Sequence, residues 1–148
     1  MLVLAAVAAN AFLSVFGGMW ACTPHVPGVV AAPVSRWSIA RAPHSAWVVV
    51  HWATRAEDGG TAYVGYLAAD QDWIYDDFHT DGSFSANTSS GPQNGTWTWE
   101  GTFTTPQREQ HGAVQWRREG KGFRQGFGRL IGTSFRETAY ATCRPAAR

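Results

Sequence analysis

A carboxylate and an imidazole lie two positions apart in the segment Trp73–His79. Alternate residues of a β-strand share one face, so Tyr75, Asp77 and His79 would point the same way. If that face is the inner one, a buried Asp77 can orient and charge His79, and such a pair supports acid–base chemistry. The alternative is that Asp76 and Asp77 are both solvated and that His79 lies at an exposed strand end.

Two other histidines are candidates for a site. His51 lies in the apolar segment Trp47–Trp52, where either face allows burial, so it is either a core residue or a ligand contact. His51, His79 and His111 come from three predicted strands, and three imidazoles can bind zinc. Their spacing does not match a known metal motif, so we predict neither a metal nor a cofactor. A nucleophile elbow, a Gly-rich phosphate loop and a CxxC pair are also missing from the sequence.

Composition predicts one folded domain and excludes several classes of partner. The 148 residues are 45% hydrophobic and 16% charged, which is unlike a disordered chain. Twelve Lys and Arg residues balance eleven Asp and Glu residues, and the cations are scattered along the chain. No net field therefore recruits nucleic acid or an anionic membrane.

The N-terminal segment 1–11 is apolar and ends in Ala9-Asn10-Ala11, a pattern that signal peptidase accepts. It is too short to span a bilayer, and it lacks a basic n-region. We predict either a truncated signal peptide over 1–11, followed by a single domain over 12–148, or a helix that continues through Phe16. Export would place the protein in a secreted or periplasmic compartment, where Cys22 and Cys143 are expected to form a disulfide. The alternative is two free buried thiols.

From residue 18 onward the sequence alternates apolar and polar residues in short runs that are separated by turn signals. The predicted strands are Gly18–Thr23, Pro33–Arg41, Ser45–Thr54, Thr61–Ala69, Trp73–Thr80, Ser83–Thr88, Gly95–Thr104, Gly112–Arg118, Gly122–Ile131 and Thr133–Cys143. Every connection is too short for a crossover helix, so neighbouring strands must pair antiparallel. An open sheet of this size would expose two edges. We therefore predict an all-β fold, a closed or nearly closed up-and-down barrel of about nine or ten strands.

The same alternation assigns an inner face to several strands. Trp97, Trp99 and Phe103 share one side of their strand, and Phe123 with Phe127 share one side of theirs. A barrel of this strand number is wider than its own side chains fill, so a cavity is expected. The predicted ligand-binding residues are Trp37, His51, Tyr75, Asp77, His79, Trp97, Trp99, Phe103, Phe123, Gln125, Phe127 and Arg129.

Several segments, in their order and spacing, resemble secreted bacterial barrels of the calycin superfamily, which includes lipocalin-like and nitrobindin-like proteins. The resemblance covers residues 17 to 144 and rests on Gly18-Met19-Trp20-Ala21-Cys22, Trp73 with Asp76-Asp77, Asp81-Gly82, Trp97–Gly101 and Phe135–Cys143. It implies a barrel whose closed end is plugged by Trp20, with Arg136, or second Arg144, packed over the indole ring. It implies no established activity. Nitrobindin-like barrels carry their haem ligand late in the chain, whereas no His follows His111 here, so haem is not expected.

The sequence thus favours a barrel that binds a small, largely apolar or aromatic ligand without changing it. One alternative is a small barrel isomerase, cyclase or hydrolase that uses Asp77 with His79 or His51. The other is a filled barrel that serves as a structural or protein-interaction module.

Overall fold

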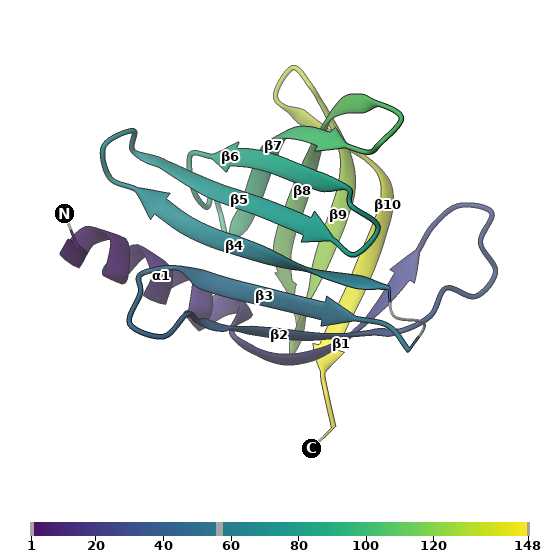
Figure 1. Ribbon diagram of the computed structural model, residues 1–148, viewed down its shortest axis with the longest axis horizontal. Helices are drawn as coiled ribbons and strands as arrows, with labels where there is room; N and C mark the ends of the chain where they lie inside the picture. Colours follow the sequence, from purple (N-terminus) through teal and green to yellow (C-terminus); the bar gives the residue numbers. More distant parts are fainter. Residues whose placement is uncertain (1, 56–57, 148) are drawn as a thin grey trace.

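The computed structural model describes residues 2–55 and 58–147, and in this part of the chain ten antiparallel strands close into one barrel (Figure 1). Going around the barrel, the order is β1-β10-β9-β8-β7-β6-β5-β4-β3-β2. The elements are α1 Leu2–Phe16, β1 Gly18–His25, β2 Ser35–Arg41, β3 Val48–Ala53, β4 Gly59–Leu67, β5 Asp72–His79, β6 Phe84–Ser89, β7 Thr96–Thr104, β8 Glu109–Glu119, β9 Gly122–Ile131 and β10 Ser134–Pro145. The predicted all-β up-and-down barrel is confirmed.

The barrel closes where its first and last strands meet. β1 pairs with β2 on one side and with β10 on the other, and Cys22 lies directly opposite Cys143. The two cysteines form a disulfide that is almost completely buried. The predicted bond is confirmed over the alternative of two free thiols. It links β1 and β10, the two strands that would be the open edges of an unclosed sheet.

The helix α1 lies against the barrel, where it contacts β2 and β4 (Figure 1). It packs two aromatic side chains into one end of the barrel. Phe12 and Phe16 are both 0% exposed. The Phe12 ring lies 5.3 Å from Trp97 and 5.6 Å from Trp116, and the Phe16 ring lies 5.4 Å from Phe123. These edge-to-face and tilted contacts are the arrangements that aromatic rings prefer. The helix thereby fills the end of the barrel at which β1 begins.

The predicted signal boundary after Ala11 falls inside α1. On the N-terminal side of that boundary, Ala9 is buried, and Arg41 donates hydrogen bonds to the carbonyl of Ala6 and to the side chain of Asn10. Phe12 and Phe16 lie on the other side, within the predicted domain. Whether residues 1–11 are removed stays a prediction. Within the described ranges, no helix has both the length and the apolar character needed to cross a membrane.

The prediction that an arginine of β10 packs over the Trp20 ring is wrong. Trp20 is buried and donates from Nε1 to the carbonyl of Phe16 at 2.8 Å, but the guanidinium over its ring belongs to Arg118 of β8, at 5.8 Å from the ring centroid. Arg118 also donates to the carbonyl of Val15 and so caps the last turn of α1. In the register of β1 and β10, the residue opposite Trp20 is Pro145. Arg136 is exposed and lies at the other end of β10, opposite Arg129 of β9.

We predict that Phe12→Ala lowers the free energy of unfolding by about 3 to 5 kcal/mol, because it removes a fully buried ring from between tryptophans. Denaturant unfolding followed by tryptophan fluorescence measures the change. Val7→Ala is the matched control on the same helix, since Val7 is 60% exposed. The control should change stability by less than about 0.5 kcal/mol. A loss below about 1 kcal/mol for Phe12→Ala would show that α1 does not plug the barrel.

We also predict that replacing both cysteines by alanine costs about 4 to 5 kcal/mol, because the bond closes a loop of 121 residues and so restricts the unfolded chain. Unfolding of the oxidised and the double-alanine proteins in denaturant gives the difference. Since hydrogen bonds still join β1 and β10, the double variant should keep the circular dichroism of the barrel. An equal stability of the two proteins would contradict the prediction.

Candidate functional site

A cavity of about 550 Å³ occupies the half of the barrel away from α1. The other half is closed by the aromatic cluster around Phe12, Phe16 and Trp116. The cavity is open to solvent, since Phe127 on its wall is 38% exposed. The lining residues are Trp37, Trp52, Tyr75, Asp77, His79, Ser85, Asn87, Gly101, Thr102, Phe103, Gln110, His111, Gly112, Ala113, Val114, Gln125, Phe127, Gly128, Arg129 and Thr138.

A chain of hydrogen bonds runs along one wall of this cavity, across β5 and β6. His79 Nε2 lies 3.0 Å from Asp77 Oδ1, and the Ser85 hydroxyl donates to Asp77 Oδ2 at 2.7 Å. The Asn87 amide donates to Ser85 Oγ at 2.7 Å and to the backbone carbonyl of Tyr75 at 3.0 Å. Asp77 is only 7% exposed, so these donors satisfy a carboxylate that would be costly to bury alone.

The hairpin between β5 and β6 places these side chains opposite one another. Its turn is fixed by Asp81, whose Oδ1 accepts from the backbone N–H of Ser83 at 2.9 Å and from the Ser83 hydroxyl at 2.6 Å. Gly82 follows with a φ of 84°, a conformation that favours glycine. The resulting register pairs Asp77 with Ser85 across the two strands. The Asp-Gly turn therefore positions the serine that holds the carboxylate.

Burial and the Asp77 carboxylate shift the acidity of the neighbouring groups. The hydrogen bond to Asp77 raises the pKa of His79 above its ordinary value of 6.5, and this effect exceeds the opposing effect of burial. The pKa of Tyr75 is raised well above 10.0, first by burial and then by the negative charge of Asp77. The wall therefore combines an imidazole that tends to carry a proton with a phenol that stays neutral.

No family model matches this chain, and no curated protein matches it in sequence.

The structure brings eight of the predicted ligand-binding residues to the cavity. They are Trp37, Tyr75, Asp77, His79, Phe103, Gln125, Phe127 and Arg129. The alternative in which Asp76 and Asp77 are both solvated is wrong for Asp77, which is buried against His79. His79 is the last residue of β5, as that alternative expected, and its side chain is 30% exposed.

Four predicted residues do not line the cavity. Trp97, Trp99 and Phe123 point inward as expected, but they are at most 1% exposed and belong to the packed half around Phe12 and Phe16. His51 is exposed on the outer face of β3, where its Nδ1 lies 2.9 Å from the hydroxyl of Thr61. It therefore neither fills the core nor joins His79 and His111 at the cavity.

Among the lining residues that the predicted ligand-binding set lacks are Trp52, Ser85 and Asn87. The inner face of β6 is polar, whereas its outer face carries Phe84, which is 41% exposed. Alternation alone therefore assigns no inner face to this strand. The Asp81-Gly82 turn is the signal that would have found Ser85, because a tight hairpin centred there puts it opposite Asp77.

Within residues 2–55 and 58–147, three buried polar atoms have no hydrogen-bond partner: Trp99 Nε1, Trp116 Nε1 and Gln125 Oε1. The two indoles lie in the packed aromatic half, and Gln125 lies on the cavity wall with 2% exposure.

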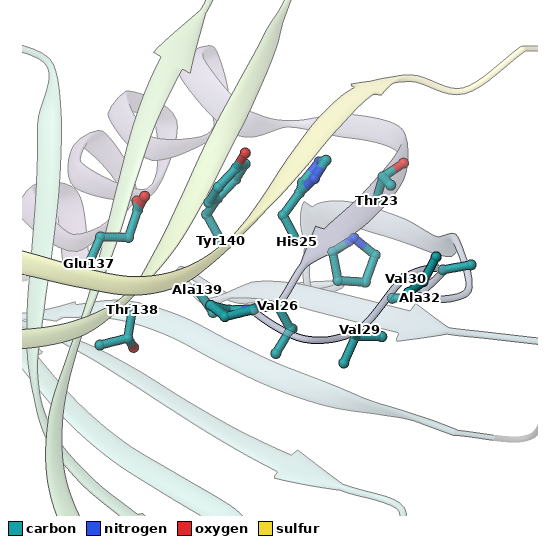
Figure 2. Close-up of a pocket in the computed structure, with 13 residues that line it drawn as sticks. Thr23, His25, Val26, Val29, Val30, Ala32, Glu137, Thr138, Ala139 and Tyr140 are labelled. Carbon is teal, nitrogen blue, oxygen red and sulfur yellow. The ribbon is translucent and has the colours of Figure 1, made fainter.

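A second hollow, of about 700 Å³, lies outside the barrel between β10 and the loop that joins β1 to β2 (Figure 2). Exposed side chains of that loop border it, among them Val26, Val29 and the fully exposed Val30. In contrast to the barrel cavity, it has no buried polar side chain among the residues that line it. We therefore place the candidate site inside the barrel.

We predict that Asp77→Asn lowers the pKa of His79 toward 6.5, because it removes the carboxylate that accepts from Nε2. NMR titration of the imidazole signals measures the shift. The matched control is Asp76→Asn on the outer face of the same strand, which should leave the His79 titration nearly unchanged.

The same variant has a pH-dependent effect on stability. The pKa of His79 is higher in the folded protein than in the unfolded chain, so protonation of His79 stabilises the fold. This contribution is complete below the pKa of the unfolded chain, and it is lost as the pH rises through the pKa of the folded protein. Asp77→Asn should therefore destabilise the protein more near pH 5.5 than near pH 8.5, given an unfolded pKa of about 6.5. Equal losses of unfolding free energy at both pH values would contradict this assignment.

Proposed function

We propose that the protein binds a small, largely apolar ligand in the open half of its barrel and releases it unchanged. The cavity carries this proposal. Its volume of about 550 Å³ lies within the range of small-molecule sites. Such sites combine an apolar lining with a few converging polar groups, which is the composition of this wall.

The apolar part of the lining supports an aromatic or aliphatic ligand body. Trp37 and Trp52 lie with ring centroids 5.6 Å apart on β2 and β3, and Phe103 and Phe127 line the cavity from β7 and β9. Phe127 leaves more than a third of its surface in water, although it points into the barrel. An apolar ligand would cover that ring and gain the free energy of removing both surfaces from water.

Membership of the calycin superfamily and export to a secreted or periplasmic location are part of the same proposal. The closed barrel of ten antiparallel strands is compatible with a calycin-like fold. The Cys22–Cys143 disulfide supports an oxidising compartment, because such bonds are rare where thiols are kept reduced.

A small barrel enzyme is the second candidate function, and the 3.0 Å contact between His79 Nε2 and Asp77 Oδ1 favours it. An imidazole oriented by a carboxylate can move a proton to or from a bound substrate. His51 has no place in this alternative because it lies on the outer face of β3. Release of an altered ligand after incubation with the protein would support the enzyme and contradict the binding proposal.

Filling the cavity tests the proposal. We predict that Val114→Trp or Gly112→Phe weakens binding of an environment-sensitive naphthalene dye about tenfold or more, because the new ring occupies the space that the dye needs. Both positions line the cavity, and a Cβ at Gly112 meets nothing closer than the Gly128 carbonyl at 3.4 Å. Fluorescence titration measures the dissociation constants.

Tyr63→Trp is the control, since Tyr63 lies on the outer face of β4 and is 44% exposed. It should leave dye binding unchanged, and circular dichroism checks that all three variants keep the barrel. Full binding by both filled variants would place the dye outside the barrel and overturn the proposal.

A further inference from the structure

We propose that Nδ1 of His79 is the atom that selects the ligand's polar group, because Asp77 holds the hydrogen-bearing Nε2 and leaves Nδ1 to the ligand. The charged imidazole then selects a carbonyl or similar acceptor, and the neutral imidazole selects an N–H donor. This inference rests on the proposed binding function and names the ligand class.

The hydrogen-bond chain on β5 and β6 has one consistent direction. The Asn87 amide nitrogen can only donate, so the Ser85 oxygen accepts from it. Ser85 has a single hydroxyl hydrogen, and it gives this hydrogen to Asp77 Oδ2. The carboxylate accepts at Oδ2 and, through Oδ1, accepts from the ring of His79 as well.

It follows that His79 Nε2 carries a hydrogen in both charge states of the ring. A neutral imidazole has one N–H, so its other nitrogen, Nδ1, is then an acceptor, and protonation turns Nδ1 into a donor. Within the described residues, Nδ1 has no hydrogen-bond partner, and the His79 side chain is 30% exposed in a residue that lines the cavity. Nδ1 is therefore available to a ligand.

Two aromatic rings hold the imidazole in place. Trp52 lies 5.2 Å from the His79 ring and Phe103 lies 5.7 Å from it, both edge to face. Both rings also line the cavity, so an apolar ligand body that packs on them lies beside Nδ1. The geometry thus joins an apolar surface to one polar atom, whereas the orphan Oε1 of Gln125 is completely buried.

The charges around His79 decide whether the charged or the neutral imidazole is favoured. Asp77 contacts the ring, and Asp58 and Asp81 lie near enough to raise its pKa further. Trp52, Ser85 and Phe103, on the neighbouring strands, carry no charge. Arg129 and His111 are the cationic and titratable groups on the other cavity walls. The three carboxylates favour the imidazolium, so an apolar carbonyl compound is the ligand class expected at any pH below the raised pKa of His79.

Three probes of similar shape test this: acetylnaphthalene, whose carbonyl only accepts; ethylindole, whose ring N–H only donates; and ethylnaphthalene, which does neither. Calorimetry gives their affinities about two pH units below and above the His79 pKa found by NMR, where the ring is almost fully charged or neutral. We expect acetylnaphthalene to bind about tenfold tighter than ethylnaphthalene at the lower pH, and this preference to disappear at the higher pH. Ethylindole should gain affinity over the same interval.

His79→Leu should make all three affinities independent of pH, and the dye titration checks that its cavity still binds. His111→Gln, on the same cavity, is the matched control and should keep the pH dependence of the wild type. If the dependence is instead lost in His111→Gln, or persists in His79→Leu, the assignment to His79 is overturned. If the probes bind with equal affinities at both pH values, this inference fails while the binding function stands. If none of the probes binds, the proposed function itself fails.

Discussion

The packing of α1 against the tryptophans inside the barrel is the contact on which the rest of the structure depends. A ten-stranded barrel is wider than its own side chains can fill, so part of its interior must be supplied by another element or stay open. Phe12 and Phe16 supply that part at one end, where Trp116 stacks on Phe123 with an interplanar angle of 9°. The packed half is filled by side chains, and the cavity lies in the other half.

The polar residues lie at the boundary between the packed half and the open half. A buried carboxylate requires hydrogen-bond donors, and Asp77 obtains them from Ser85 and His79. Its neighbour Tyr75 lies closer to the aromatic core and is 3% exposed, whereas His79 lies closer to the opening. One strand thus leads from an apolar core to solvent within a few residues. Because burial decreases along this strand, the imidazole of His79 is held by the protein and can still be reached by a ligand.

Alternation in the sequence predicts on which face a side chain lies, but not at which height along the barrel axis. Alternation therefore predicts the correct face for Trp97, Trp99 and Phe123 but does not predict that they lie in the packed half, because the height depends on how far α1 enters the barrel. His51 could not be placed, since both faces of its strand are apolar. Arg118 was missed because its position over Trp20 depends on the register between distant strands. The closed barrel was predictable because the connections between strands are short. The disulfide was predictable because the two cysteines lie on the first and last predicted strands.

The disulfide at the seam has a consequence for the covalent structure of the chain. Cys22 and Cys143 lie on the first and last strands, so the backbone between them and the bond itself form one closed ring that contains most of the barrel. A single cut in any loop of that ring opens it without dividing the molecule. The cut protein would have the connectivity of a circular permutant, with new ends at a loop and every strand still beside its neighbours. The barrel can therefore survive one proteolytic nick with its cavity intact.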